Sequence, residues 1–182
     1  SNNQQANNTV NASTNGVTGV LTLDTDVKTS CGYTADQLKE AIAKIHSNCA
    51  ALNYPEQALA AEQKTGINAL FCISVAIYEQ GWDGIEGKGG PINTTGANWG
   101  NYNIFNIEGP NTSNGRWRDY SSYEEAFEGF GQLIGGSGYY GAGLTTIGKI
   151  APRYCPPGDT WGPGVCGVAK MITDGIPNSG SG

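Results

Sequence analysis

Apolar residues recur at helical spacing through the first half of the chain. After Thr34, a favourable N-cap residue, they alternate between four and three positions apart, at Leu38, Ile42, Ile45, Cys49 and Leu52. Two further helices are predicted over residues 55–63 and 67–79. The second is apolar on nearly all sides, which is typical of a helix in the centre of a core. Gly81 is a suitable residue to end it.

The second half of the chain continues with a glycine-rich segment and then returns to helical spacing. Residues 81–101 contain seven glycines and show little periodicity, so we expect a loop or a small irregular lobe there. A Ser-Ser-Tyr-Glu capping-box pattern opens a predicted helix over residues 121–134. Two short helices are predicted near 144–150 and 165–173, without convincing β-strand alternation. The predicted fold class is therefore mainly α.

The two ends of the chain differ from its middle in composition. Residues 1–30 are rich in Asn, Thr, Ser and Gly and contain few large apolar side chains, which is typical of a flexible linker or arm. Residues 177–182 have a similar composition and are predicted to be a flexible tail. We therefore expect one domain over residues 31–176, joined to other modules of a larger multi-domain protein.

Charge and hydropathy argue against two classes of partner. The 182 residues carry a formal net charge of -6, which disfavours nucleic acid because phosphate binding needs a basic face. The longest apolar run extends from Ala69 to Tyr78, whereas a membrane-spanning helix needs roughly 20 residues. We therefore expect neither nucleic-acid binding nor a membrane span in this chain.

The five cysteines are spaced in a way that does not predict a metal centre. There is no C-x-x-C pair and only one histidine, so no metal site and no cofactor are expected. In an exported protein, Cys155 and Cys166 would be the most suitable pair for a disulfide, because they flank a turn-rich segment. Cys31 and Cys49 could form a second disulfide if the loop before the first helix folds back. Cys72 is predicted to be buried and free.

Two other motifs have a structural interpretation. A Ser-His-Asp triad or a Cys-His pair would have to use His46, the only histidine. The position of His46 on the first predicted helix indicates a structural or surface role. The segment Gly136–Gly141 matches G-x-G-x-x-G, but it follows a predicted helix where a dinucleotide site requires a strand. We interpret it as a helix stop and a loop.

Glu79 is the strongest candidate for chemistry, because it ends the apolar run on a carboxylate. Burial and the negative end of the helix dipole both favour the neutral form and so raise the pKa of a carboxyl group. A carboxyl group that keeps its proton near neutral pH can act as a general acid toward a glycosidic oxygen. The alternative is an ordinary solvated acid at a helix end.

Four segments, in this order along the chain, resemble motifs of one enzyme family. Glu79-Gln-Gly-Trp82 is similar to Glu-Ser-Gly-Trp around a catalytic acid, and residues 102–109 are similar to Asn-Leu-Phe-Gly-Ile-Lys-Gly. Arg118-Asp-Tyr120 with the helix after it, and residues 150–157 around Tyr154, resemble two later motifs. The family is the glucosaminidases of glycoside hydrolase family 73, which are peptidoglycan hydrolases. The resemblance covers residues 34–173 and implies a lysozyme-like globular domain with a small irregular or β lobe around an active-site cleft.

The resemblance also implies roles for individual residues. Glu79 would be the general acid, and Tyr154 would support the substrate's 2-acetamido group or the positive charge at the anomeric carbon. The residues expected to contact sugar are Trp82, Trp99, Tyr102, Asn103 and Phe105. A packing role is the alternative for Tyr154 and for each of these five residues.

The group that activates water is less well defined by the sequence. Glu86 is the candidate base, with Asp83 as a second choice, because both lie in the glycine-rich segment. The substrate's acetamido oxygen, or the 6-hydroxyl group of muramic acid in a lytic transglycosylase, could replace a second carboxylate. Three positions depart from the family pattern, with Gln80 in place of Ser, Asn106 in place of Gly and Glu108 in place of Lys.

The function that the resemblance favours is an endo-β-N-acetylglucosaminidase that acts on peptidoglycan glycan strands. The expected location is then extracellular or in the cell wall. A muramidase or lytic transglycosylase of the same fold is an alternative within the same chemistry. A non-catalytic wall-binding or assembly module of a secretion, conjugation or phage apparatus is the alternative from another class.

Overall fold

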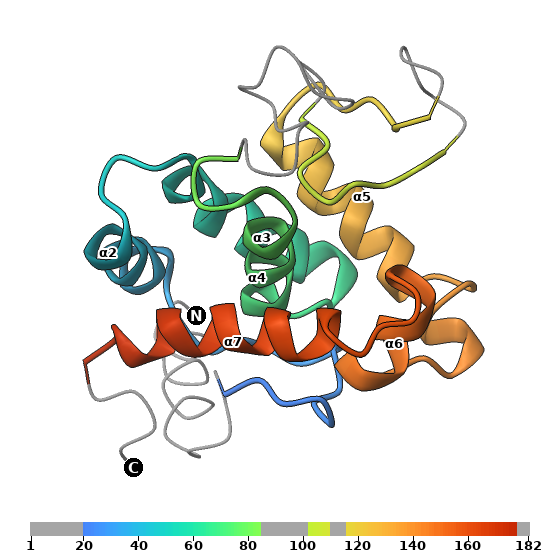
Figure 1. The fold of residues 1–182 in the computed structure, drawn as a ribbon. Helices are drawn as coiled ribbons and strands as arrows, with labels where there is room; N and C mark the ends of the chain where they lie inside the picture. Colours follow the sequence, from blue (N-terminus) through green and yellow to red (C-terminus); the bar gives the residue numbers. More distant parts are fainter. Residues whose placement is uncertain (1–19, 85–101, 110–115, 178–182) are drawn as a thin grey trace, which may run out of the picture.

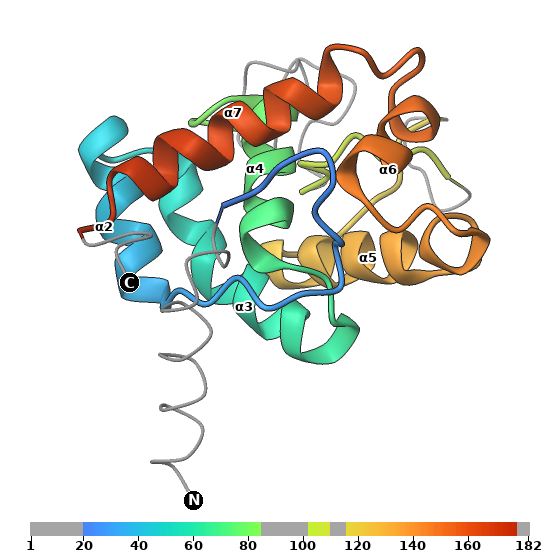
Figure 2. The same ribbon diagram turned by 90° about the horizontal axis from the view of Figure 1, so that it is seen from below.

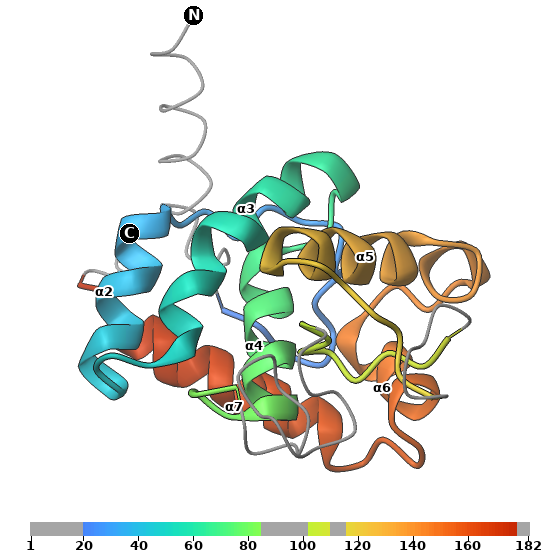
Figure 3. The same cartoon turned by 90° about the horizontal axis from the view of Figure 1, so that it is seen from above.

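The computed structural model describes residues 20–84, 102–109 and 116–177, and these form a helical body built around one central helix. Its elements in chain order are α2 (Ala35–Ile45), the 3-10 turn η1 (Ala50–Asn53), α3 (Tyr54–Thr65), α4 (Ala69–Gln80), α5 (Tyr123–Gly135), the 3-10 turn η2 (Tyr140–Ala142), α6 (Ile147–Tyr154) and α7 (Trp161–Asp174). Helix α4 lies in the middle, with α3 and α7 packed directly against it (Figures 1 and 3). Beyond these, α5 packs on α3, and α2 packs on α7.

Helix α4 is the element that positions the candidate acid. The side chain of Asn68 accepts a hydrogen bond from the Phe71 N–H and caps its start, and Gly81 ends it with a φ of 73°. Every side chain of α4 is buried except those of Tyr78 and Glu79. The predicted central helix and its stop at Gly81 are therefore confirmed, and the core fixes the last turn of α4 in place.

Aromatic rings fill the space between α4, α5 and α7. The rings of Phe105 and Phe130 stack with their centroids 4.2 Å apart, and Phe71 packs edge-on against Trp161 at 6.3 Å. Each such pair contributes about 0.5–1.5 kcal/mol beyond the burial of its area. This cluster forms the wall behind the last turn of α4.

Residues 20–30 correct the predicted domain boundary. Val27 is fully buried, and its N–H donates to the Thr145 carbonyl oxygen at 2.9 Å while its own carbonyl oxygen accepts from the Asn68 N–H at 2.8 Å. Leu21 is also buried, and the segment runs alongside α4 and α6 (Figure 2). The composition of this segment predicted an arm. The segment is held mainly by backbone hydrogen bonds, and these leave no apolar pattern in the sequence.

The predicted helices are present, with differences at several ends. The first ends at Ile45, and its apolar pattern continues into η1 without a helix. Ser122 caps α5, so this helix begins about two residues later than predicted. Helix α7 begins at Trp161, earlier than predicted, because Pro163 lies in its first turn, where a backbone N–H has no partner within the helix.

Both predicted disulfides are absent from the structure, which describes all five cysteines and contains them as free thiols. Cys155 lies beside Glu79, whereas Cys166 faces a separate groove together with Leu21. Cys31 lies at the start of α4, where its N–H donates to the same carboxylate oxygen as the Ala69 N–H. Cys49 lies near the other end of α4, a helix of 12 residues that is about 18 Å long at 1.5 Å of rise per residue. Cys72 is buried and free, as predicted.

In the described parts of the chain, no helix has the length and apolar character required to cross a membrane.

Candidate active site

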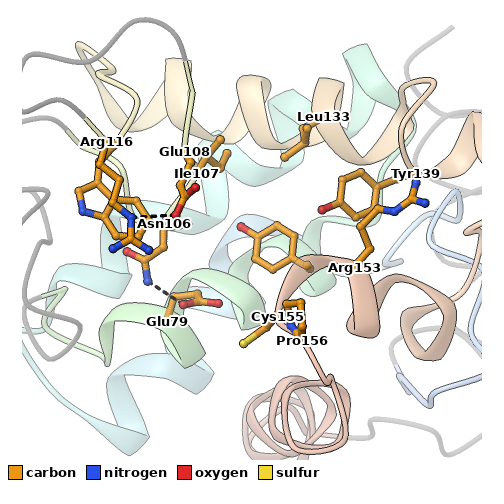
Figure 4. A pocket seen from close by; sticks show the side chains of 12 residues that line it. Glu79, Asn106, Ile107, Glu108, Arg116, Leu133, Tyr139, Arg153, Cys155 and Pro156 are labelled. Carbon is orange, nitrogen blue, oxygen red and sulfur yellow. Dashed lines mark hydrogen bonds and ion pairs between the residues drawn. The ribbon is translucent and has the colours of Figure 1, made fainter.

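A cavity of about 570 Å³ opens beside the last turn of α4 (Figure 4). Its walls come from α4, α5, α6, the loop before α6 and the two loop segments around residues 106–108 and 116–117. The lining residues are Glu79, Asn106, Ile107, Glu108, Arg116, Trp117, Leu133, Tyr139, Arg153, Tyr154, Cys155 and Pro156. Two of the predicted site residues, Glu79 and Tyr154, therefore line one cavity.

Both carboxylate oxygens of Glu79 accept a hydrogen bond. Oε1 accepts from Trp161 Nε1 at 2.9 Å, and Oε2 accepts from Asn106 Nδ2 at 2.6 Å. Burial raises the pKa of Glu79 above its usual range, and the hydrogen bonds from Trp161 and Asn106 oppose part of that rise because they stabilise the charged form. Glu79 is thus a partly buried carboxyl group in a fixed orientation, with a tendency to hold its proton.

Asn106 is itself held by a residue of α4. Gln80 is fully buried and donates from Nε2 to Asn106 Oδ1 at 2.5 Å. Asn106 has a φ of 54°, a left-handed conformation that asparagine adopts more readily than most residues. Two of the positions that depart from the family motif therefore lie in contact, next to the acid.

Tyr154 forms part of the inner wall of the cavity. Its hydroxyl group donates to the carbonyl oxygen of Phe105, and its ring centroid lies 4.9 Å from that of Trp161. Burial, followed by the negative charge of Glu79, raises the pKa of this phenol well above its usual value. Tyr154 is therefore a neutral hydrogen-bonding group, and its predicted role toward the substrate stays a prediction.

Residues 102–105 lie beside the cavity without lining it. Asn103 is fully buried; its side chain accepts from the Ile107 N–H at 2.9 Å and donates to the Ile107 and Arg118 carbonyl oxygens at 2.7 and 2.9 Å. Phe105 is fully buried as well. Direct contact of these two side chains with a sugar is therefore wrong for this structure, because neither is accessible. Tyr102 packs edge-on against Tyr123 at 5.1 Å, outside the lining of the cavity.

The remaining predicted residues fall elsewhere. Trp82 packs against the core and does not line the cavity. Asp83 Oδ2 lies 3.3 Å from His46 Nε2, also away from the cavity, and both side chains are exposed, so His46 lies at the surface as its position predicted. Glu86 and Trp99 lie outside the described residues.

Sequence reasoning missed the residues that form the outer walls. Arg116 lies over the ring of Trp117 at 4.4 Å and pairs with Glu108 at 2.8 Å. On the opposite side, Arg153 donates to the Gly138 carbonyl oxygen and lies over the ring of Tyr139 at 6.0 Å. Aromatic faces suit pyranose rings, and guanidinium groups suit carboxylates. The signal in the sequence was the Arg-Trp-Arg run at 116–118 and the arginine before Tyr154.

Comparison with known proteins identifies the fold. No protein-family model matches the sequence, and no curated protein is significantly similar to it. A solved structure of a catalytic mutant of S. aureus autolysin E, in complex with the disaccharide NAG-NAM, matches with a TM-score of 0.61 at 13% identity, covering 82% of this chain and 70% of that one. Another structure of autolysin E matches with a TM-score of 0.59 at 14% identity, covering 96% of this chain and 78% of that one. The fold is lysozyme-like. The predicted mainly α, lysozyme-like fold class is confirmed, and at these identities the similarity establishes the fold. The small lobe predicted in the glycine-rich segment lies largely outside the described residues.

Among the described residues of this lysozyme-like domain, two acids line the cavity. Glu79 is partly buried, and burial raises its pKa, whereas Glu108 is largely exposed and pairs with Arg116. No group of three or more His, Cys, Asp or Glu side chains among the described residues is close enough together to hold a metal ion. The acid-base chemistry available in the described part of the site therefore centres on Glu79.

Proposed function

We propose that this chain hydrolyses peptidoglycan glycan strands at a β-1,4 glycosidic bond, as an endo-β-N-acetylglucosaminidase with Glu79 as its general acid. The observation that carries the proposal is the partly buried Glu79 carboxyl group, which has a donor on each oxygen and opens into a cavity with aromatic walls. The lysozyme-like fold adds support, because a neighbour with that fold was solved with NAG-NAM. The proposed location is extracellular or in the cell wall, within a larger protein.

The mechanism follows from the protonation state of Glu79. The protonated carboxyl group donates its proton to the glycosidic oxygen as the bond from that oxygen to the anomeric carbon breaks. Negative charge then develops on the carboxylate, where Trp161 and Asn106 already donate hydrogen bonds. These donors need no rearrangement during the reaction, so they stabilise the transition state. With a second carboxylate as base, water adds to the anomeric carbon and gives its proton to that base. In the alternative, the 2-acetamido oxygen bonds to the anomeric carbon as the leaving oxygen departs, and water then opens the cyclic intermediate and gives its proton to the Glu79 carboxylate.

Product analysis tests the proposal directly. Soluble fragments released from purified peptidoglycan are expected to end in reducing N-acetylglucosamine, as measured by mass spectrometry. Reducing muramic acid ends would indicate a muramidase, and 1,6-anhydro ends would indicate a lytic transglycosylase. No release from several wall types, with retained binding to the insoluble wall, would favour a non-catalytic wall-binding module.

Two single variants are expected to show whether Glu86 or Glu108 is the base that activates water. We propose Glu86 as the base, so Glu86→Gln should lower kcat by about 10²- to 10⁴-fold, the usual contribution of general acid-base catalysis. Glu108→Gln, the matched control inside the cavity, should change kcat only a few-fold, because its ion pair with Arg116 is largely exposed. Steady-state kinetics on a soluble glycan fragment measures both. The reverse order would assign the base to Glu108, and two small effects would favour the acetamido oxygen.

A further inference from the structure

The side chains of Gln80 and Asn106 form a chain of two hydrogen bonds that ends on the candidate acid. Gln80 Nε2 donates to Asn106 Oδ1 at 2.5 Å, and Asn106 Nδ2 donates to Glu79 Oε2 at 2.6 Å. The chain begins inside the core, because Gln80 is fully buried, and it ends at the cavity wall, which includes Asn106. It thus connects the core to the reacting carboxyl group.

The direction of these hydrogen bonds decides what Asn106 can do. A side-chain amide has a donor end and an acceptor end, and a half-turn about its last bond exchanges them. Gln80 places a donor against Oδ1 of Asn106, which leaves Nδ2 facing Glu79. In this orientation Asn106 donates to a negatively charged carboxylate, whereas the reversed orientation would bring two acceptors together. Gln80 therefore selects the orientation of Asn106 that supports the ionised acid.

The surroundings of Gln80 indicate that packing alone does not explain why a glutamine occupies this buried position. Its Oε1 atom is buried and has no hydrogen-bond partner among the described residues. A buried acceptor without a partner lowers stability, so an apolar side chain of similar volume would suit this position better in the folded state. The hydrogen bond that Gln80 does form is the one to Asn106.

We infer that Gln80 and Asn106 are positioning residues for the general acid: Gln80 fixes the Asn106 amide, and Asn106 stabilises the negative charge that develops on Glu79 as the proton leaves. The inference rests on the proposed function. Because that charge is larger in the transition state than in the enzyme-substrate complex, the pair contributes to kcat more than to KM.

Other charged groups near Glu79 leave this assignment intact. Burial and the charge of Glu79 raise the pKa values of Tyr154 and Cys155, so both groups are neutral at pH 7. The other ionisable groups that line the cavity are Glu108, Arg116, Tyr139 and Arg153, and Glu108 and Arg116 are paired with each other.

Two variants test the pair without removing the acid. Gln80→Met keeps the volume but removes the donor, and Asn106→Gly keeps the left-handed backbone but removes the amide. We expect kcat to fall about ten- to hundredfold for Asn106→Gly and by a smaller factor for Gln80→Met, with KM within about twofold of the wild type. The double variant should be no slower than Asn106→Gly, because both changes remove the same contribution. Tyr78→Phe, on the same turn but outside the cavity, is the matched control and should leave kcat unchanged.

Two further measurements separate this inference from a structural role and from the proposed function. Gln80→Met should unfold at the same temperature as the wild type or higher, since it removes the unpartnered oxygen, so a lower kcat could not be attributed to lost stability. Titration of the Glu79 side-chain carboxyl group by NMR should give a higher midpoint in Gln80→Met. That higher midpoint in a protein without glycan turnover would support the pair and reject the proposed function. An unchanged midpoint and an unchanged kcat in Gln80→Met would overturn the inference.

Discussion

Glu79→Gln is expected to abolish release of peptidoglycan fragments while the protein stays folded. The variant keeps the size of the side chain and an oxygen that can accept a hydrogen bond, but it has no acidic proton to give to the leaving oxygen. The loss in kcat should be about 10²- to 10⁴-fold. Quantitative mass spectrometry of soluble fragments measures turnover, and circular dichroism verifies that the helices are retained.

The chain offers a matched control for this variant. Glu62 is also a partly buried carboxyl group whose pKa is raised by burial, but it accepts hydrogen bonds from the Cys31 and Ala69 N–H groups and does not line the cavity. Glu62→Gln makes the same chemical change away from the cavity and should retain turnover. Equal turnover by the wild type and Glu79→Gln would reject Glu79 as the acid.

Replacement of Trp161 is expected to have the second large effect. It has two parts, a loss of stability and a change in the pH dependence of kcat. The side chain is almost completely buried, so Trp161→Ala should lower the free energy of unfolding by about 3–5 kcal/mol, as other large aromatic truncations do. Trp161→Phe keeps most of the packing and removes the Nε1–H that donates to Glu79. Chemical denaturation of both variants measures the first part, and a loss of less than 1 kcal/mol in Trp161→Ala would contradict the burial argument.

The pH dependence of Trp161→Phe gives the second part. The lost hydrogen bond stabilises the charged form of Glu79, so its removal raises the pKa of Glu79 further. A general acid works only when protonated, and activity falls as the pH rises through its pKa. The alkaline limb of the kcat profile should therefore move to higher pH in Trp161→Phe. An unchanged limb would show that Trp161 does not influence the proton that is transferred, and a limb that moves to lower pH would contradict the expected sign.

The sequence predicted the helices and the position of Glu79 at a helix end because both depend on short-range information. The apolar run that ends at Glu79 and the glycine after it define the end of α4 within a few residues. The hydrogen-bond partners of Glu79 could not be found in this way. Asn106 and Trp161 lie 27 and 82 residues farther along the chain, and only the packing of α4 against α7 and the adjoining loop brings them together.

The same distinction explains the errors. Asn103 and Phe105 belong to the segment over residues 102–109 that resembles a family motif. The resemblance does not indicate which side chains of the segment face the core. Cys155 and Cys166 are close in sequence, yet α7 begins between them and they line different cavities. A short separation in sequence did not mean that the two cysteines lie together in the fold.

The nearly complete burial of α4 has a consequence for how such domains can change during evolution. The location of the acid is set by a helix with no solvent-facing side other than Tyr78 and Glu79, and therefore by the core as a whole. Cavity walls that do not contact Glu79, such as the segment carrying Arg116 and Trp117, can then exchange residues without moving Glu79. The fold match with autolysin E at 13% identity shows how far the sequence of such a domain can differ while the helical core is kept.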